Sequence, residues 1–193
     1  MPDHELSSVL EAVRACTRCV ADLPLGPKPI IQASASARIL IIGQAPGTKA
    51  HESGCPWNDQ SGNRLREWTG LAEAEFYDES KVAIVPAGLC YPGAIPGGGD
   101  KPPVPACAPL WHARILPLLT NVWLTLLVGL HAQKLYLKGG RSLTELVRQH
   151  PQSSPVIPLP HPSWRGVGWM RKNAWFESES LPMLRKRIEE ALR

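Results

Sequence analysis

The sequence predicts a single α/β domain over residues 1–193, a three-layer α/β/α sandwich around a short, mainly parallel four-stranded sheet. Short apolar runs alternate with segments of helical spacing, as in parallel sheets covered by helices on both faces. Neither an internal repeat nor a composition shift marks a domain boundary. With 44% hydrophobic and 20% charged residues, the chain resembles ordinary globular proteins, which excludes a disordered chain, a coiled coil and a collagen.

The N-terminal segment predicts one helix followed by an extended stretch. Apolar residues recur at helical spacing over Leu6–Ala15 and stop at a Cys-x-x-Cys pair, Cys16 and Cys19. Three prolines within residues 24–29 then keep the chain extended up to Ile31.

The first two strands are predicted by continuous apolar runs. Arg38–Ile42 (RILII) is closed by Gly43, and Val82–Val85 is closed by Pro86. Such runs are typical of strands buried on both faces. Pro86 ends the second strand because it has no N–H to donate to a neighbouring strand.

Two loops and one helix are predicted around these strands. The segment Gln44–Gln60 has no regular pattern and is expected to be a loop. A helix is expected to begin at its N-cap Ser61 and to end at Gly70. Residues 91–105 (YPGAIPGGGDKPPVP) form a second long loop, and a loop of this length in a compact domain is usually functional or disordered.

The rest of the chain continues the alternation of helices and strands. The predicted elements are helix Ala106–Leu119, strand Val122–Gly129, helices His131–Lys138 and Leu143–His150, strand Val156–Leu159 and helix Trp175–Leu192. The longest apolar run, Val122–Leu130, is far shorter than the roughly 18 residues of a membrane span, so no membrane partner is expected. The N-terminus lacks the apolar core of a signal peptide, so a cytoplasmic protein is expected.

The chain contains five cysteines, and in a reducing cytoplasm these indicate metal binding or catalysis more than disulfides. Cys16 and Cys19 form the N-terminal pair, whereas Cys90 and Cys107 lie after the second strand. Whichever four are grouped, one cysteine is left over.

Three segments leave strands at their carboxyl ends, where α/β proteins bind ligands: GQAPG at 43–47, PAGLC at 86–90 and HPSWR at 161–165. The glycines of GQAPG let the backbone turn sharply and approach a ligand, although a plain strand-to-loop turn explains this motif equally well. HPSWR offers groups that could bind a base and phosphates. Considered alone, however, its histidine is more simply interpreted as a hydrogen-bonded residue of a surface loop.

The three motifs IIGQAPG, GCPW and HPSWR occur in the order found in the uracil-DNA glycosylase superfamily, which this sequence resembles over residues 16–165. The cysteine pattern is similar to that of its iron–sulfur families four and five. The resemblance implies one glycosylase-like domain over the whole chain, with DNA as its partner and a monomer as its expected state.

The resemblance also implies that Cys16, Cys19, Cys90 and Cys107 bind a [4Fe–4S] cluster, for which four thiolates are the usual ligands. Two other interpretations remain open, a Cys₄ zinc site and four unrelated buried cysteines. Cys55 lies inside the GCPW turn and is expected to be a free thiol near the pocket.

The implied reaction is base excision, in which the enzyme flips a damaged base out of DNA and hydrolyses its N-glycosidic bond. By analogy, Trp57 stacks on the flipped base, and His161 donates to uracil O2 and stabilises the departing anion. The backbone of Gly43, Gln44 and Ala45 lines the same pocket, and Gln44 is included among the catalytic candidates.

The sequence departs from the family at its catalytic carboxylate. Positions 44 and 45, where families four and one carry an acid, hold Gln44 and Ala45. Asp59 is the preferred candidate for orienting the attacking water, and capping the next helix is its equally weighted structural role. Glu52 and, as a weaker general base that would contact the substrate, His51 are the alternatives.

A second departure concerns base recognition. Pro86 stands where iron–sulfur members usually carry an asparagine that reads the uracil edge. A pocket without that amide should discriminate less sharply, so uracil is the default and hypoxanthine or xanthine are further candidates. The two departures also motivate an alternative function, a catalytically weak protein that binds DNA damage or abasic sites. An iron–sulfur electron carrier is disfavoured because it would leave GQAPG and HPSWR without a role.

Contacts to DNA are expected from the closing loop and the residues just beyond it. Trp164 is expected either to wedge into the duplex or to pack against Trp169. The candidates for DNA binding are Ser163, Trp164, Arg165, Arg171 and Lys172.

Overall fold

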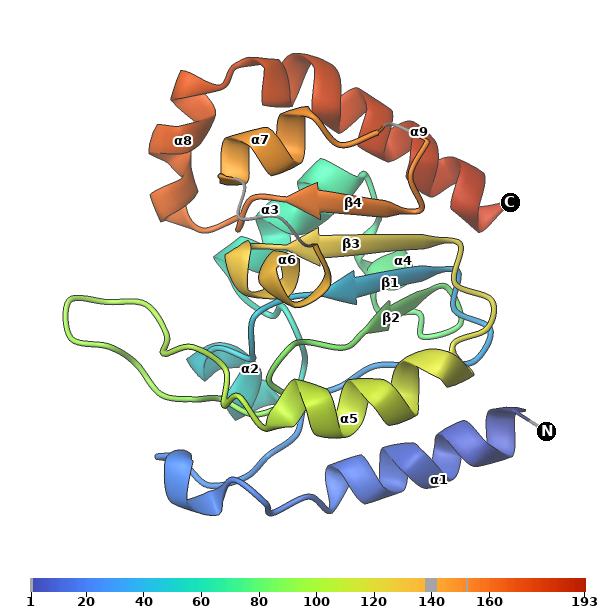
Figure 1. Cartoon of the computed structure of the whole chain (residues 1–193), viewed down its shortest axis with the longest axis vertical. Coiled ribbons are helices and arrows are strands. Elements are labelled where there is room, and N and C mark those ends of the chain that lie inside the picture. Colours follow the sequence, from blue (N-terminus) through green and yellow to red (C-terminus); the bar gives the residue numbers. More distant parts are fainter. Residues whose placement is uncertain (1, 138–141, 152) are drawn as a thin grey trace.

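A four-stranded sheet with the order β2-β1-β3-β4 lies at the centre of the protein, and every strand pairing in it is parallel (Figure 1). The structure is a computed structural model that describes residues 2–137, 142–151 and 153–193. The strands are β1 (Ile39–Ile42), β2 (Val82–Ile84), β3 (Leu124–Val128) and β4 (Val156–Leu159). The predicted α/β fold is therefore confirmed, with a sheet that is wholly parallel.

Helices cover both faces of the sheet (Figure 1). The α-helices are α1 (Pro2–Arg14), α2 (Thr48–Ser53), α3 (Gln60–Thr69), α4 (Glu73–Phe76), α5 (Cys107–Ile115), α6 (Leu130–Tyr136), α7 (Leu143–Arg148), α8 (Val167–Lys172) and α9 (Leu181–Leu192). Shorter helical turns are η1 (Val20–Asp22), η2 (Leu116–Leu118), η3 (Trp164–Gly166) and η4 (Phe176–Ser180).

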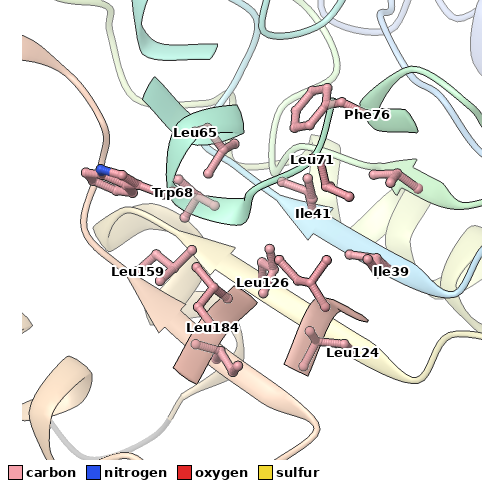
Figure 2. Packing of buried hydrophobic residues seen from close by; sticks show 14 of the residues in the cluster. Ile39, Ile41, Leu65, Trp68, Leu71, Phe76, Leu124, Leu126, Leu159 and Leu184 are labelled. Atoms are coloured by element: carbon pink, nitrogen blue, oxygen red, sulfur yellow. The ribbon is translucent and has the colours of Figure 1, made fainter. Parts of the chain in front are cut away.

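Alternate side chains of each strand enter two separate cores. Leu40 and Ile42 of β1 pack with residues of α1 and α5, whereas Ile39 and Ile41 pack with residues of α3 and α9. Figure 2 shows the second core, in which Leu65 lies on one side of Ile41 and Leu126 on the other. This alternation is the period-2 geometry of a strand buried on both faces, and it makes the three layers.

Two short helices lie in segments that carry no predicted helix. The expected loop Gln44–Gln60 contains α2, which begins after Gly47 and ends at Gly54 in the left-handed conformation, φ 75°. Helix α4 lies between α3 and β2. With six and four residues, neither helix is long enough to show a periodic pattern.

The N-cap predicted at Ser61 is wrong by two residues. Asp59, not Ser61, is the N-cap, and Ser61 lies inside the helix. Gly70 ends the helix with φ 73°, as predicted.

The C-terminal part holds more helix than expected. The HPSWR segment runs into η3 and α8, and the predicted helix Trp175–Leu192 begins as a π-helical turn before α9. The predicted end of the helix after β3, at Lys138, lies outside the described residues, which show α6 up to Tyr136. In the described part of the chain, no helix combines the length and apolar character that a membrane span requires.

Candidate active site

A cavity of about 330 Å³ opens at the carboxyl ends of the strands. Its walls come from the turn after β1, the segment leading into α3, the loop after β4 and the long loop after β2. The predicted site residues that line it are Gly43, Gln44, Ala45, Trp57, Asp59, His161, Ser163, Trp164 and Arg165. Segments far apart in the sequence therefore meet at one cavity.

The rings of Trp57 and His161 lie together in the cavity wall, with centroids 5.7 Å apart and planes inclined by 36°. Burial lowers the pKa of His161, an effect that the Asp59 carboxylate opposes and the nearby His131 strengthens. The imidazole is therefore neutral at pH 7, and in this form one ring nitrogen donates a hydrogen bond while the other accepts.

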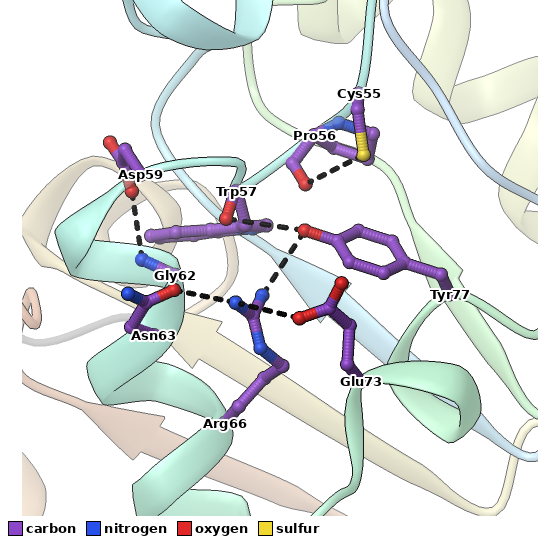
Figure 3. Close-up of polar contacts among 9 residues, drawn as sticks. All are labelled: Cys55, Pro56, Trp57, Asp59, Gly62, Asn63, Arg66, Glu73 and Tyr77. Carbon is purple, nitrogen blue, oxygen red and sulfur yellow. Dashed lines mark hydrogen bonds and ion pairs between the residues drawn. The ribbon is translucent and has the colours of Figure 1, made fainter.

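Trp57 is held in an unusual conformation. Its φ of 56° is left-handed, which no other non-glycine residue in the described chain shares. Its carbonyl accepts a hydrogen bond from the Tyr77 hydroxyl at 3.3 Å, and Arg66 donates to that hydroxyl at 3.1 Å (Figure 3). Burial raises the pKa of Tyr77 to about 12, so the hydroxyl keeps its proton. Gly43 lies against the indole, since a Cβ there would stand 2.8 Å from the ring.

Asp59 both caps helix α3 and lines the cavity. The Gly62 N–H donates a hydrogen bond to Asp59 Oδ1 at 2.8 Å, so the structural role predicted for Asp59, capping the next helix, is confirmed (Figure 3). The same side chain lines the cavity. The cap therefore fixes a carboxylate at the cavity wall.

Three predicted residues are not brought to the cavity. His51 lies on α2 with its ring 6.0 Å from that of Tyr91, and the Lys28 amine donates to its carbonyl. Arg171 and Lys172 are exposed in the last turn of α8.

Trp164 projects from the cavity rim, with 72% of its surface exposed. The guanidinium of Arg165 lies over its ring, 5.1 Å from the centroid. The alternative expectation that Trp164 packs against Trp169 is wrong, because Trp169 instead packs edge to face against Trp175 and Phe176.

The cavity also contains a carboxylate that the sequence analysis missed. Asp100 and Gly99, from the long loop after β2, line the cavity together with Asp59. Burial, and then the charge of Asp59, raise the pKa of Asp100. The only sequence signal was the length and glycine content of the loop, which does not say where it folds.

The cysteines of the predicted metal site lie around one apolar pocket, separate from the cavity. Its lining includes Cys16, Cys19, Cys90 and Cys107, together with Leu89 and Trp111. The Leu89 N–H donates to Cys107 Sγ at 3.3 Å. In the described residues, no group of three or more His, Cys, Asp or Glu side chains is arranged to hold a metal ion. The fifth cysteine, Cys55, lies beside Pro56 (Figure 3).

Comparison with known families agrees with this geometry. The family model of the uracil DNA glycosylase superfamily matches residues 31–185, which include the turn after β1, Trp57 and the loop after β4. The Cys16–Cys19 pair lies outside the matched residues. The match spans most of the sequence, and the chain belongs to the uracil DNA glycosylase superfamily.

Proposed function

We propose that this protein is a DNA glycosylase of base excision repair that removes uracil from DNA and leaves an abasic site. The observation that carries the proposal is the pairing of Trp57 and His161 in one cavity, next to the turn of Gly43–Ala45. An aromatic face and a neutral hydrogen-bond donor are the two groups that a flipped pyrimidine requires.

In this proposal the base enters the cavity and stacks on the Trp57 indole. His161 donates its N–H to the O2 carbonyl oxygen of uracil, where negative charge accumulates as the glycosidic bond breaks. A neutral imidazole suits this role because it is fixed before the reaction and stabilises the charge without transferring a proton. The carboxylate of Asp59 stands at the cavity wall, where it holds the attacking water near the sugar.

The pocket supports a broader choice of base than uracil alone. Pro86 lines the cavity and has no N–H, and its carbonyl accepts a hydrogen bond from His112 Nε2 at 3.0 Å. This position therefore cannot supply the paired donor and acceptor with which an amide reads uracil. We propose hypoxanthine and xanthine as secondary substrates.

The rim of the cavity has the features of a DNA contact surface. Trp164 is exposed and apolar, so it can fill the gap that a flipped base leaves in the stack. Ser163 and Arg165 lie beside it, and Arg171 and Lys172 extend the positive surface along α8.

We also propose that the four pocket cysteines bind a [4Fe–4S] cluster and that the protein belongs to the iron–sulfur branch. Four thiols on one apolar pocket fit the ligand chemistry of such a cluster. Zinc is bound by four sulfurs at about 2.3 Å, which requires them to be close together, whereas a cluster with four separate irons accepts a wider arrangement. The cluster would tie the segment after α1 to the start of α5 and has no part in the chemistry.

The function is tested by excision from oligonucleotides that carry one uracil, hypoxanthine or xanthine, in single and double strands. Alkali cleaves the strand wherever a base has been removed, so strand cleavage reports excision. We expect the highest single-turnover rate for uracil. Tight binding of abasic DNA without excision of any base would instead identify the alternative, a damage-binding protein of the same fold.

A further inference from the structure

The long loop after β2 brings a second carboxylate to the cavity. We propose that Asp100 is a further catalytic residue, which faces the sugar of the flipped nucleotide, stabilises positive charge at C1′ and accepts a proton from the attacking water. This inference rests on the proposed glycosylase function. It assigns a role to a loop that the family motifs do not include.

The position of Asp100 is defined by the cavity itself. Its side chain shares the cavity with Asp59 and His161, and its Oδ2 would lie 3.3 Å from a Cβ added to Gly47. Asp100 therefore lies against the turn that follows β1. In the proposed pose, the base fills the space near Trp57 and His161, so the sugar lies toward the cavity mouth and its carboxylates.

The loop is held in place on both sides of Asp100. Arg165 donates hydrogen bonds to the carbonyls of Gly97 and Gly98 at 3.2 and 2.7 Å. The Gln44 side-chain amide donates to the carbonyl of Lys101 at 2.9 Å. Residues of the first and last motifs thus position Asp100, and the structure gives the Gln44 side chain this positioning role.

The two carboxylates differ in a way that suits different tasks. Asp59 accepts a hydrogen bond from the Gly62 N–H through Oδ1. Asp100 keeps access to solvent, and two influences, burial and the charge of Asp59, raise its pKa. Both influences make Asp100 more basic, and a more basic carboxylate is the better proton acceptor. Asp59 then acts as a fixed charge that orients the water, and Asp100 takes the proton.

The step balances without any co-reactant. The C1′–N bond breaks, and both of its electrons leave with the base as an anion. The water oxygen bonds to C1′, and one water proton passes to the Asp100 carboxylate. Asp100 then releases that proton to the base anion or to solvent, which leaves the free base and an abasic sugar.

The first test compares the single-turnover excision rates of Asp100→Asn, Asp59→Asn and Glu189→Gln. Glu189 is exposed on α9, so its variant matches the charge change away from the cavity. We expect Asp100→Asn to slow excision by roughly 10²–10⁴-fold, while Glu189→Gln keeps the wild-type rate. If Asp100→Asn excises as fast as wild type while Asp59→Asn does not, the inference is wrong and the proposed function stands.

The second test measures binding, so it does not depend on excision. Duplexes carry either a cationic pyrrolidine or a neutral tetrahydrofuran in place of one nucleotide, and affinity is measured by fluorescence anisotropy. We expect wild type to prefer the cation by about tenfold or more, and Asp100→Asn to lose most of this preference while binding the neutral analogue unchanged.

The two tests separate the two claims. A wild-type protein that excises no base contradicts the proposed function, yet a cation preference that Asp100→Asn abolishes would still place Asp100 at the sugar. An undiminished cation preference in Asp100→Asn, or none in wild type, overturns the inference whatever the excision rate.

Discussion

The carbonyl oxygen of Trp57 occupies the space that a side chain on Gly62 would need. A Cβ built on Gly62 would stand 1.7 Å from this oxygen, far inside van der Waals contact. The close approach lets the first turn of α3 pack beneath the left-handed Trp57, whose carbonyl also accepts the Tyr77 hydrogen bond. The position of the indole in the cavity therefore depends on the absence of one methyl group.

Gly62→Ala should displace Trp57 and impair the site. Inserting a methyl group where backbone already lies costs about 1–3 kcal/mol, so we expect a lower free energy of unfolding in urea and weaker excision. Gly168→Ala is the matched control, because nothing lies within 4 Å of a Cβ there and the residue lies in α8. Equal stability and activity of the two variants would show that the Trp57 turn adapts freely.

His161→Ala should reduce excision by roughly 10²–10³-fold, the usual cost of one preorganised donor. Affinity for abasic DNA should stay within a few-fold, because the missing group acts on the departing base. The exposed His4 on α1 supplies the control variant His4→Ala. A His161→Ala protein with most of its single-turnover rate would make this histidine structural.

The same histidine predicts a pH dependence. Burial lowers the pKa of His161, so its neutral form persists as the pH falls through 6.5, where an ordinary histidine is half protonated. The ratio of the wild-type rate to the His161→Ala rate should therefore stay constant through pH 6.5 and fall only below the lowered pKa. A ratio that halves near pH 6.5 would contradict a buried, neutral donor.

The cysteine assignment predicts two classes of variant. Cys16→Ala should lose iron, the visible absorbance of the purified protein and thermal stability, since the pocket would lack one of its four thiolates. Cys55→Ala should keep the iron, the absorbance and the thermal stability, because the Cys55 thiol contacts the Pro56 carbonyl and does not line that pocket. Iron content is measured by elemental analysis, and equal iron in Cys16→Ala and wild type would exclude the assignment.

The strands could be predicted from the sequence because each is a short, mainly apolar run between breakers. The predicted boundaries of β4 agree with the structure, and those of β1 and β2 differ by one residue. Burial on both faces leaves such a run few alternatives. The short helices α2 and α4 could not be predicted, because tertiary packing and caps define them, not periodicity.

The site was predictable only where its residues belong to contiguous motifs. Trp57 and His161 lie in such motifs, and the structure brings them together. Asp100 could not be found, because its place depends on hydrogen bonds from Gln44 and Arg165, which are far away in the sequence. For His51, proximity in the sequence was misleading, since α2 directs its ring toward Tyr91.

Asp59 allows chemistry and structure to be separated with two substitutions. Asp59→Asn keeps an oxygen for the Gly62 N–H, so stability should change little while excision at saturating enzyme slows, because the charge is lost. Asp59→Ala loses both functions, and the lost cap should cost about 1 kcal/mol, which lowers the melting temperature by roughly 2–4 °C in a chain of this size. Calorimetry and single-turnover excision on the same preparations measure the two effects. If Asp59→Asn excises at the wild-type rate while Asp59→Ala is only less stable, Asp59 is a helix cap alone, and the charge at the sugar must come from another carboxylate.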